Sequence, residues 1–121
     1  MKRVLIVDDD RDLANVLKIR LEKECQFEVR TVSGGHEALQ VVREDPPDMI
    51  LMDVLMPRID GLSTLKELKR ATPKKIPVII MTAKATMTKE AFELEGAVDF
   101  FVKPVDGKAL ISRMNEILNS K

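Results

Sequence analysis

Four short apolar runs, each followed directly by a charged or hydroxylated residue, constrain the fold of this chain more than any other feature. The runs are Val4–Val7 before Asp8, Asp9 and Asp10, Met49–Met52 before Asp53, Val78–Met81 before Thr82, and Phe100–Val102 before Lys103. Apolar runs of this length are typical of buried strands in a parallel sheet. In an open α/β sheet, ligands bind just beyond the carboxyl ends of the strands. We therefore expect three carboxylates, one hydroxyl and one ammonium group to meet in a single crevice.

Segments with helical spacing alternate with the predicted strands. The strands are expected at about residues 3–7, 28–32, 48–52, 78–81 and 99–102, with 28–32 at a sheet edge because its polar and apolar residues alternate. A first helix is expected at 11–24, where Leu13, Val16, Leu17 and Leu21 recur at helical spacing. Further helices are expected around residues 38–42, after a cap at Asp60, within 85–95, and after a cap at Asp106. Strict alternation predicts an α/β fold, a doubly wound five-stranded parallel sheet with five helices.

Length and composition narrow the class of protein. The 121 residues, 45% of them apolar, suit a single domain spanning 1–121 with a real core. With 20 basic and 20 acidic residues and neither Trp nor Tyr, the chain lacks the basic and aromatic surface of a nucleic-acid binder. It also lacks a run of apolar residues long enough for a secretory leader or a membrane span. We expect a soluble cytoplasmic protein that contacts neither nucleic acid nor membrane.

The predicted cluster of Asp8, Asp9 and Asp53 requires neutralisation. Two unit charges about 4 Å apart repel by roughly 4 kcal/mol at an effective dielectric constant near 20. Mg²⁺ binds oxygen ligands and commonly shares a phosphate oxygen, so it suits this set. Acidic residues also favour a helix N-terminus, and Asp10 is open to that simpler role. Asp53 is able to act as a metal ligand, as a nucleophile that forms an acyl phosphate, or as both.

Five segments of the chain form a set of motifs with a specific order and spacing: Val4–Asp10, Asp53–Gly61, Met81–Ala83, Gly96–Phe100 and Lys103–Pro104. In that order and spacing, the chain resembles the receiver domain of two-component response regulators over essentially its whole length. The resemblance implies the flavodoxin-like strand order 2-1-3-4-5. It also implies that a partner histidine kinase or phosphotransfer protein phosphorylates the domain, which then controls an output protein or a fused effector domain. No turnover of an external substrate is expected.

The resemblance assigns a role to each matching residue. Asp53 corresponds to the phosphoacceptor, and Asp8 and Asp9 to the acidic pair that binds Mg²⁺ together with Asp53 and the backbone carbonyl of Leu55. Thr82 corresponds to the switch hydroxyl, Phe100 to the switch aromatic and Lys103 to the lysine that pairs with the phosphoryl group. The Lys103–Pro104 peptide bond is expected to be cis, and the segment from Thr82 to Gly96 is about one residue shorter than usual.

Three other functions remain open on the sequence. A phosphatase with an Asp nucleophile would use an Asp-x-Asp pair, which Asp53-Val54-Leu55 lacks. A flavin-binding electron carrier of similar fold would need a phosphate-binding loop where Asp8, Asp9 and Asp10 would repel the phosphate. A degenerate receiver would act as an interaction module without phosphorylation. Because all three share one architecture, the fold alone does not choose among them.

Overall fold

The computed structural model describes residues 1–53, 61–71, 75–82 and 96–119 of the chain. Its strands are β1 (Arg3–Val7), β2 (Glu28–Val32), β3 (Met49–Asp53), β4 (Val78–Thr82) and β5 (Asp99–Val102). Its helices within these ranges are α1 (Arg11–Cys25), α2 (Gly35–Glu44), α3 (Gly61–Arg70) and α5 (Gly107–Asn119). The short helix expected within 85–95 lies outside the described residues. The third strand begins and ends one residue later than predicted, so Asp53 belongs to the strand itself.

The five strands form one parallel sheet in the order β2-β1-β3-β4-β5, as expected. All residues of β3 and β4 are buried, whereas the edge strands β2 and β5 are partly exposed. This difference explains why β3 and β4 read as continuous apolar runs and β2 as an alternating segment. No helix in the described part of the chain is both long enough and apolar enough to cross a membrane.

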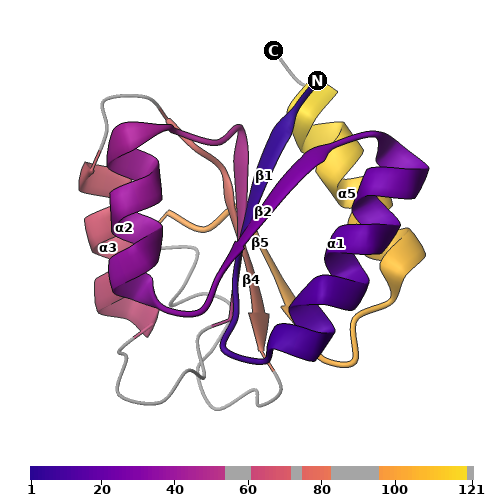
Figure 1. Cartoon of the computed structure of the whole chain (residues 1–121), viewed down its shortest axis with the longest axis horizontal. Helices are drawn as coiled ribbons and strands as arrows, with labels where there is room; N and C mark the ends of the chain where they lie inside the picture. Colours follow the sequence, from indigo (N-terminus) through magenta and orange to yellow (C-terminus); the bar gives the residue numbers. More distant parts are fainter. Residues whose placement is uncertain (54–60, 72–74, 83–95, 120–121) are drawn as a thin grey trace.

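Helices cover both faces of the sheet, with α1 and α5 on one side and α2 and α3 on the other (Figure 1). Alternate residues of each strand enter opposite cores, since successive side chains point to opposite faces. In β3, for example, Met49 and Leu51 pack toward α1 and α5, whereas Ile50 and Met52 pack toward α2 and α3. Two apolar layers therefore hold the central strands rigidly from both sides.

Helix α1 contacts the sheet with only part of the apolar set that its spacing predicted. Ala14 and Leu21 are buried and Leu17 packs beside them, whereas Leu13 is 45% exposed and Val16 is 64% exposed. The apolar residues of this segment are spread around too much of the helix to contact the sheet together. Leu13 and Val16 consequently face solvent.

Side-chain caps define where two helices begin. Asp10 precedes α1, and its carboxylate accepts a hydrogen bond from the Leu13 amide at 3.1 Å. The carboxylate of Asp106 accepts a hydrogen bond from the Lys108 amide at 3.0 Å at the start of α5, which confirms the second predicted cap. The predicted cap at Asp60 lies outside the described residues.

Replacing the cap of α1 tests its contribution to stability. Asp10→Ala removes the acceptor for the Leu13 amide, and we expect the free energy of unfolding to fall by about 1 kcal/mol. Urea denaturation followed by circular dichroism measures the change. Asp10→Asn keeps a capping oxygen and should stay close to the parent protein. Equal losses in the two variants would show that the cap does not act through this hydrogen bond.

Candidate functional site

The polar residues after the apolar runs converge at the carboxyl edge of the sheet, as predicted. Asp8 follows β1, Asp53 and Thr82 end β3 and β4, and Lys103 follows β5. The Lys103 amide donates a hydrogen bond to the Thr82 carbonyl at 2.7 Å, which holds the backbone of Lys103 beside the end of β4. Asp8 is 3% exposed, Asp53 6% and Thr82 1%. Three polar side chains are thus withdrawn from bulk water at the ends of rigid strands.

The Lys103 ammonium group joins two of the carboxylates directly. Its Nζ lies 2.7 Å from Asp8 Oδ2 and 3.1 Å from Asp53 Oδ2. A buried carboxylate is costly unless it is paired and hydrogen-bonded. One cation therefore offsets part of the repulsion between Asp8 and Asp53.

Burial and ion pairing act in opposite directions on the pKa values of Asp8 and Lys103. Burial raises the pKa of Asp8 above its ordinary value, although the Lys103 ammonium and the Asp10 amide both favour the ionised form. Burial alone would lower the pKa of Lys103, but the hydrogen bonds to Asp8 and Asp53 outweigh it and raise that pKa. Lys103 therefore stays charged, while the negative charge on Asp8 carries a cost that a further cation would relieve.

Asp9 completes a set of carboxylates that fits a metal ion. One carboxylate oxygen each from Asp8, Asp9 and Asp53 all lie within 4.8 Å of one another. Oxygens bound to the same Mg²⁺ lie no more than about 4.2 Å apart, because each Mg–O distance is about 2.1 Å. Side-chain rotation that brings these oxygens closer together would let all three bind one ion, so these residues fit Mg²⁺. Leu55, predicted to add its carbonyl, lies outside the described residues.

Thr82 and Phe100 lie on the face of the sheet opposite to Asp53. Side chains alternate between the two faces of a strand, so Asp53 lies on the same face of β3 as Met49 and Leu51, toward α1 and α5. Phe100 packs against the core on the other side, toward α2 and α3. Thr82 lies on the same face of β4 as Ile80, which enters this same core. Phe100 pairs with Ile80, two residues before Thr82, and is partly buried. The two predicted switch residues therefore share one face of neighbouring strands.

One contact that orients Asp8 was not predicted. The Asp10 amide donates a hydrogen bond to Asp8 Oδ1 at 3.0 Å. This contact joins the carboxylate to the backbone two residues later, a local pattern common for aspartate in turns. The Asp8-x-Asp10 spacing was the signal in the sequence that would have suggested it. Asp10 thus serves the site through its backbone and caps α1 through its side chain.

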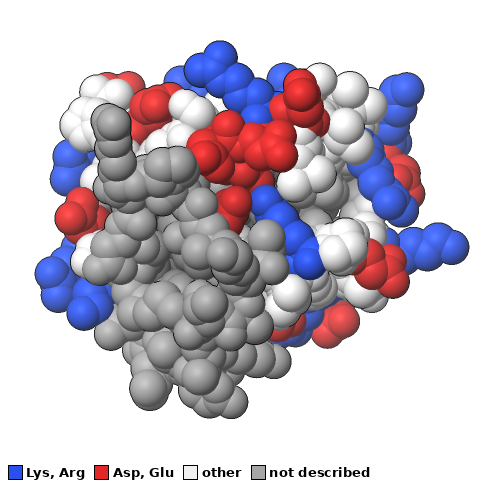
Figure 2. All heavy atoms as spheres, turned by 90° about the horizontal axis from the view of Figure 1, so that it is seen from below, with Lys and Arg blue, Asp and Glu red and all other residues white. Residues whose placement is uncertain are grey.

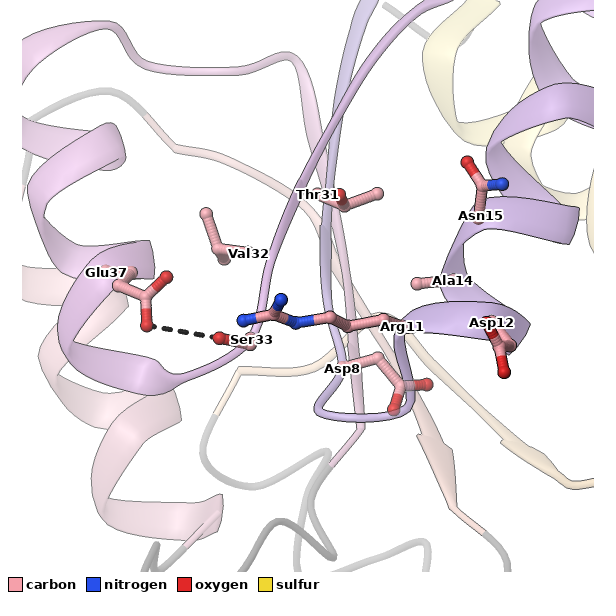
Figure 3. A pocket seen from close by; sticks show the side chains of 9 residues that line it. All are labelled: Asp8, Arg11, Asp12, Ala14, Asn15, Thr31, Val32, Ser33 and Glu37. Carbon is pink, nitrogen blue, oxygen red and sulfur yellow. Dashed lines mark hydrogen bonds between the residues drawn. The ribbon is translucent and has the colours of Figure 1, made fainter.

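An open polar cavity of about 440 Å³ adjoins the carboxylates, between α1 and the start of α2. Asp8 lies on its wall, and the Arg11 side chain extends across it toward Ser33, whose hydroxyl donates a hydrogen bond to Glu37 (Figure 3). Acidic side chains gather on the face of the molecule seen from below (Figure 2). The cavity is not evident from the apolar runs, because its residues come from helix starts, a turn and the end of the edge strand β2.

The comparisons with known proteins agree with this geometry. The family model of the response regulator receiver domain matches residues 4–115. The chain belongs to this family. The transcriptional regulatory protein CpxR of Klebsiella pneumoniae is 39% identical over 119 residues, covering 98% of this chain and 50% of CpxR. The chain thus spans about half the length of the curated relatives it matches.

Solved receiver domains share the fold closely. The receiver domain of Francisella response regulator 1452 is 32% identical, with a TM-score of 0.87 and coverage of 98% of both chains. A CheY-like receiver domain protein from Methanospirillum hungatei JF-1 is 29% identical, with a TM-score of 0.89, over 98% of this chain and 94% of that one. The Lys103–Pro104 bond of the present receiver domain is cis, as the family resemblance implied.

Removing the ammonium group tests its role in stability. Lys103→Met keeps an apolar stem but takes the counter-charge from Asp8 and Asp53, so we expect the free energy of unfolding to fall by about 3 kcal/mol near neutral pH. Without the ammonium, the pKa of Asp8 in the folded state rises further above its unfolded value. The folded state then holds more protons than the unfolded state, and stability falls as pH rises through the folded pKa.

Urea denaturation of Lys103→Met at pH 5 and pH 8 measures this difference, with the greater loss expected at pH 8. Lys108→Met removes an exposed lysine of α5 and should change stability by less than about 0.5 kcal/mol at either pH. A loss in Lys103→Met that is the same at both pH values would contradict the electrostatic explanation.

Proposed function

We propose that this receiver domain accepts a phosphoryl group on Asp53 from a phosphohistidine of a partner histidine kinase or phosphotransfer protein. The observation that supports this most directly is the buried Asp53 carboxylate, held 3.1 Å from the Lys103 ammonium. The neighbouring carboxylates of Asp8 and Asp9 add the oxygen ligands of a divalent cation. The domain is then a signalling switch in a two-component system and turns over no external substrate.

In the proposed transfer, a carboxylate oxygen of Asp53 attacks phosphorus as the bond from phosphorus to the imidazole nitrogen breaks. The leaving imidazole keeps the electron pair of that bond, and Asp53 becomes an acyl phosphate. Because Asp53 attacks as a carboxylate, no general base is required. Phosphoryl transfer depends mainly on positioning and charge stabilisation, and the fixed Lys103 ammonium provides both beside the attacking oxygen.

Asp8, Asp9 and Asp53, with the Leu55 carbonyl, would hold Mg²⁺. When bound, Mg²⁺ supplies positive charge to the phosphoryl oxygens and lowers the repulsion among the carboxylates. The raised pKa of Asp8 supports this assignment, because burial already makes its negative charge costly without a further cation.

The proposed response to phosphorylation involves the opposite face of the sheet. The Thr82 hydroxyl moves to hydrogen-bond a phosphoryl oxygen, and Phe100 turns toward the space that Thr82 leaves. The shared face of these residues on β4 and β5 supports this coupling, and Phe100 carries no hydroxyl that would fix its position. Phosphorylation thereby shifts the balance between two conformations, and this shift controls an output protein or effector domain.

Labelling with acetyl phosphate tests the acceptor and the metal together. In the presence of Mg²⁺, we expect the intact mass to increase by one phosphoryl group, located on Asp53 by peptide mapping after reduction of the acyl phosphate. Addition of EDTA should reduce the labelling at least about tenfold, since the three carboxylates then lack their neutralising cation.

Two carboxyl-to-amide variants serve as a matched pair for this experiment. Asp53→Asn should take up no phosphoryl group. Asp10→Asn changes a neighbouring carboxylate whose side chain caps α1, and it should label like the parent protein. Labelling of Asp53→Asn to the same extent as the parent would exclude Asp53 as the acceptor, and equal labelling in EDTA would exclude the metal.

Fluorine NMR of a labelled Phe100 tests the switch. We expect the Phe100 resonance to shift when beryllofluoride, a mimic of the acyl phosphate, is added to the parent protein with Mg²⁺. In Thr82→Ala, which has no hydroxyl to recruit, the shift should be largely lost although the mimic still binds. An equal shift of the resonance in both proteins would show that Phe100 responds independently of the Thr82 hydroxyl.

A further inference from the structure

Lys69, in the last turn of α3, is held differently from the exposed lysines in the described part of the chain. Its Nζ donates a hydrogen bond at 2.9 Å to the carbonyl of Ile76, which precedes β4. Its stem runs alongside Gly96, where a β-carbon would lie only 3.1 Å from Lys69 Cε. Gly96 has a φ of +104°, a conformation that glycine adopts readily. The backbone thus makes room for this side chain between the approaches to β4 and β5.

The surroundings of the Lys69 amine disfavour its positive charge. The residue is only partly exposed, and among the described residues its ammonium contacts a carbonyl oxygen and forms no ion pair. An ammonium withdrawn from water without an anion loses hydration that one neutral acceptor does not replace. Burial accordingly lowers the pKa of Lys69, whereas the carboxylates beside Lys103 raise the pKa of that residue. Near neutral pH, a larger share of Lys69 than of an exposed lysine is therefore the neutral amine, which is the nucleophilic form.

Basic side chains around Lys69 favour an anionic reagent. Lys66 lies three residues earlier on the same side of α3, and Lys75 directly precedes Ile76, whose carbonyl binds the Lys69 amine. Both of these lysines are exposed. Glu67 is two residues from Lys69, and residues at that spacing point to different sides of a helix. The positive charge on this side of α3 therefore raises the local concentration of small anions.

We propose that Lys69 is a modification site whose amine is acylated by small acyl phosphates, such as acetyl phosphate. The ammonium first loses a proton to water, and its nitrogen then attacks the carbonyl carbon of the acyl group. The bond from that carbon to the phosphate oxygen breaks, inorganic phosphate leaves with the electron pair, and a second proton passes from nitrogen to water. The product is an amide whose remaining N–H is still able to donate to the Ile76 carbonyl.

This modification site lies at the opposite edge of the sheet from the proposed phosphoacceptor. Ile76 precedes β4 and Gly96 precedes β5, whereas Asp53 is the last residue of β3. One reagent would therefore modify the domain in two ways, on Asp53 by attack at its phosphorus and on Lys69 by attack at its carbonyl carbon. The acylation requires neither Asp53 nor Mg²⁺, so the inference goes beyond the proposed function and does not rest on it.

Site-resolved acetylation of the intact protein tests this inference, with Lys75 as the matched lysine. Lys75 shares the basic surroundings of Lys69 but is exposed. The protein is incubated with acetyl phosphate and EDTA, and quantitative peptide mass spectrometry gives the initial rate of acetylation at each lysine. At pH 8, we expect Lys69 to react at least about threefold faster than Lys75, because more of its amine is neutral.

Three controls separate burial from local sequence and from the phosphorylation site. In guanidinium chloride, which unfolds the chain but keeps its sequence, the two rates should agree within about twofold. In the folded protein, the advantage of Lys69 should decline as the pH rises toward about 10, because the exposed lysine then also becomes neutral. Asp53→Asn should leave the rate at Lys69 within about twofold of the parent, since the two sites are separate.

A Lys69 rate no greater than that of Lys75 in the folded protein would overturn the proposal. A rate advantage that persists in guanidinium chloride would overturn it as well, by assigning the reactivity to local sequence. An advantage that does not decline with rising pH would reject the neutral amine of a buried lysine as its cause. Acetylation of Lys69 in a protein that takes up no phosphoryl group on Asp53 with Mg²⁺ would support this inference while the proposed function fails.

Discussion

The ion pairs of Lys103 with Asp8 and Asp53 are the interaction on which the site depends. In the order β1-β3-β4-β5, Lys103 follows a strand that lies two positions from β3, about 10 Å away at the usual strand spacing. Only a long cationic side chain reaches across that interval, and the hydrogen bond of its backbone to Thr82 fixes where it starts. The same contacts neutralise part of the carboxylate charge and tie the ends of three strands together, so Lys103 stabilises the edge of the sheet that holds the proposed phosphoacceptor.

The proposed phosphoacceptor and the proposed switch residues lie on opposite faces of the sheet. Alternation of side chains along β3 and β4 places Asp53 toward α1 and α5 but Thr82 toward α2 and α3. The proposed chemistry at Asp53 would thus take place on one side of the sheet, while Phe100 packs against the core on the other side. Thr82 stands at the end of the strand beside Asp53, and it is therefore the residue best placed to transmit a change at the acceptor across the sheet.

Prediction from sequence was accurate where one physical rule determines the outcome. Parallel strands buried on both faces are continuous apolar runs, and their carboxyl ends share one edge, so Asp8, Asp53, Thr82 and Lys103 were brought together correctly. Prediction was less accurate for α1, because its apolar residues are spread over more than one face of the helix. Their spacing alone therefore does not determine which of them contact the sheet. The contact of Asp8 with the Asp10 amide was also missed, although aspartate often accepts a hydrogen bond from the backbone amide two residues later, as it does here.

The orientation of α1 follows from the site that precedes it. Asp10 caps the helix through its side chain and binds Asp8 through its amide, so the first turn of α1 is held at the carboxylates. Ala14 and Leu21 then meet the sheet, and Leu13 turns toward Pro104, beside Lys103. Single exposed apolar residues are common on proteins and need no explanation. Here, however, the contacts that organise the carboxylates also place Leu13 on the wall of an apolar groove that touches Asp8 and Lys103, so the position of this groove follows from that of the site.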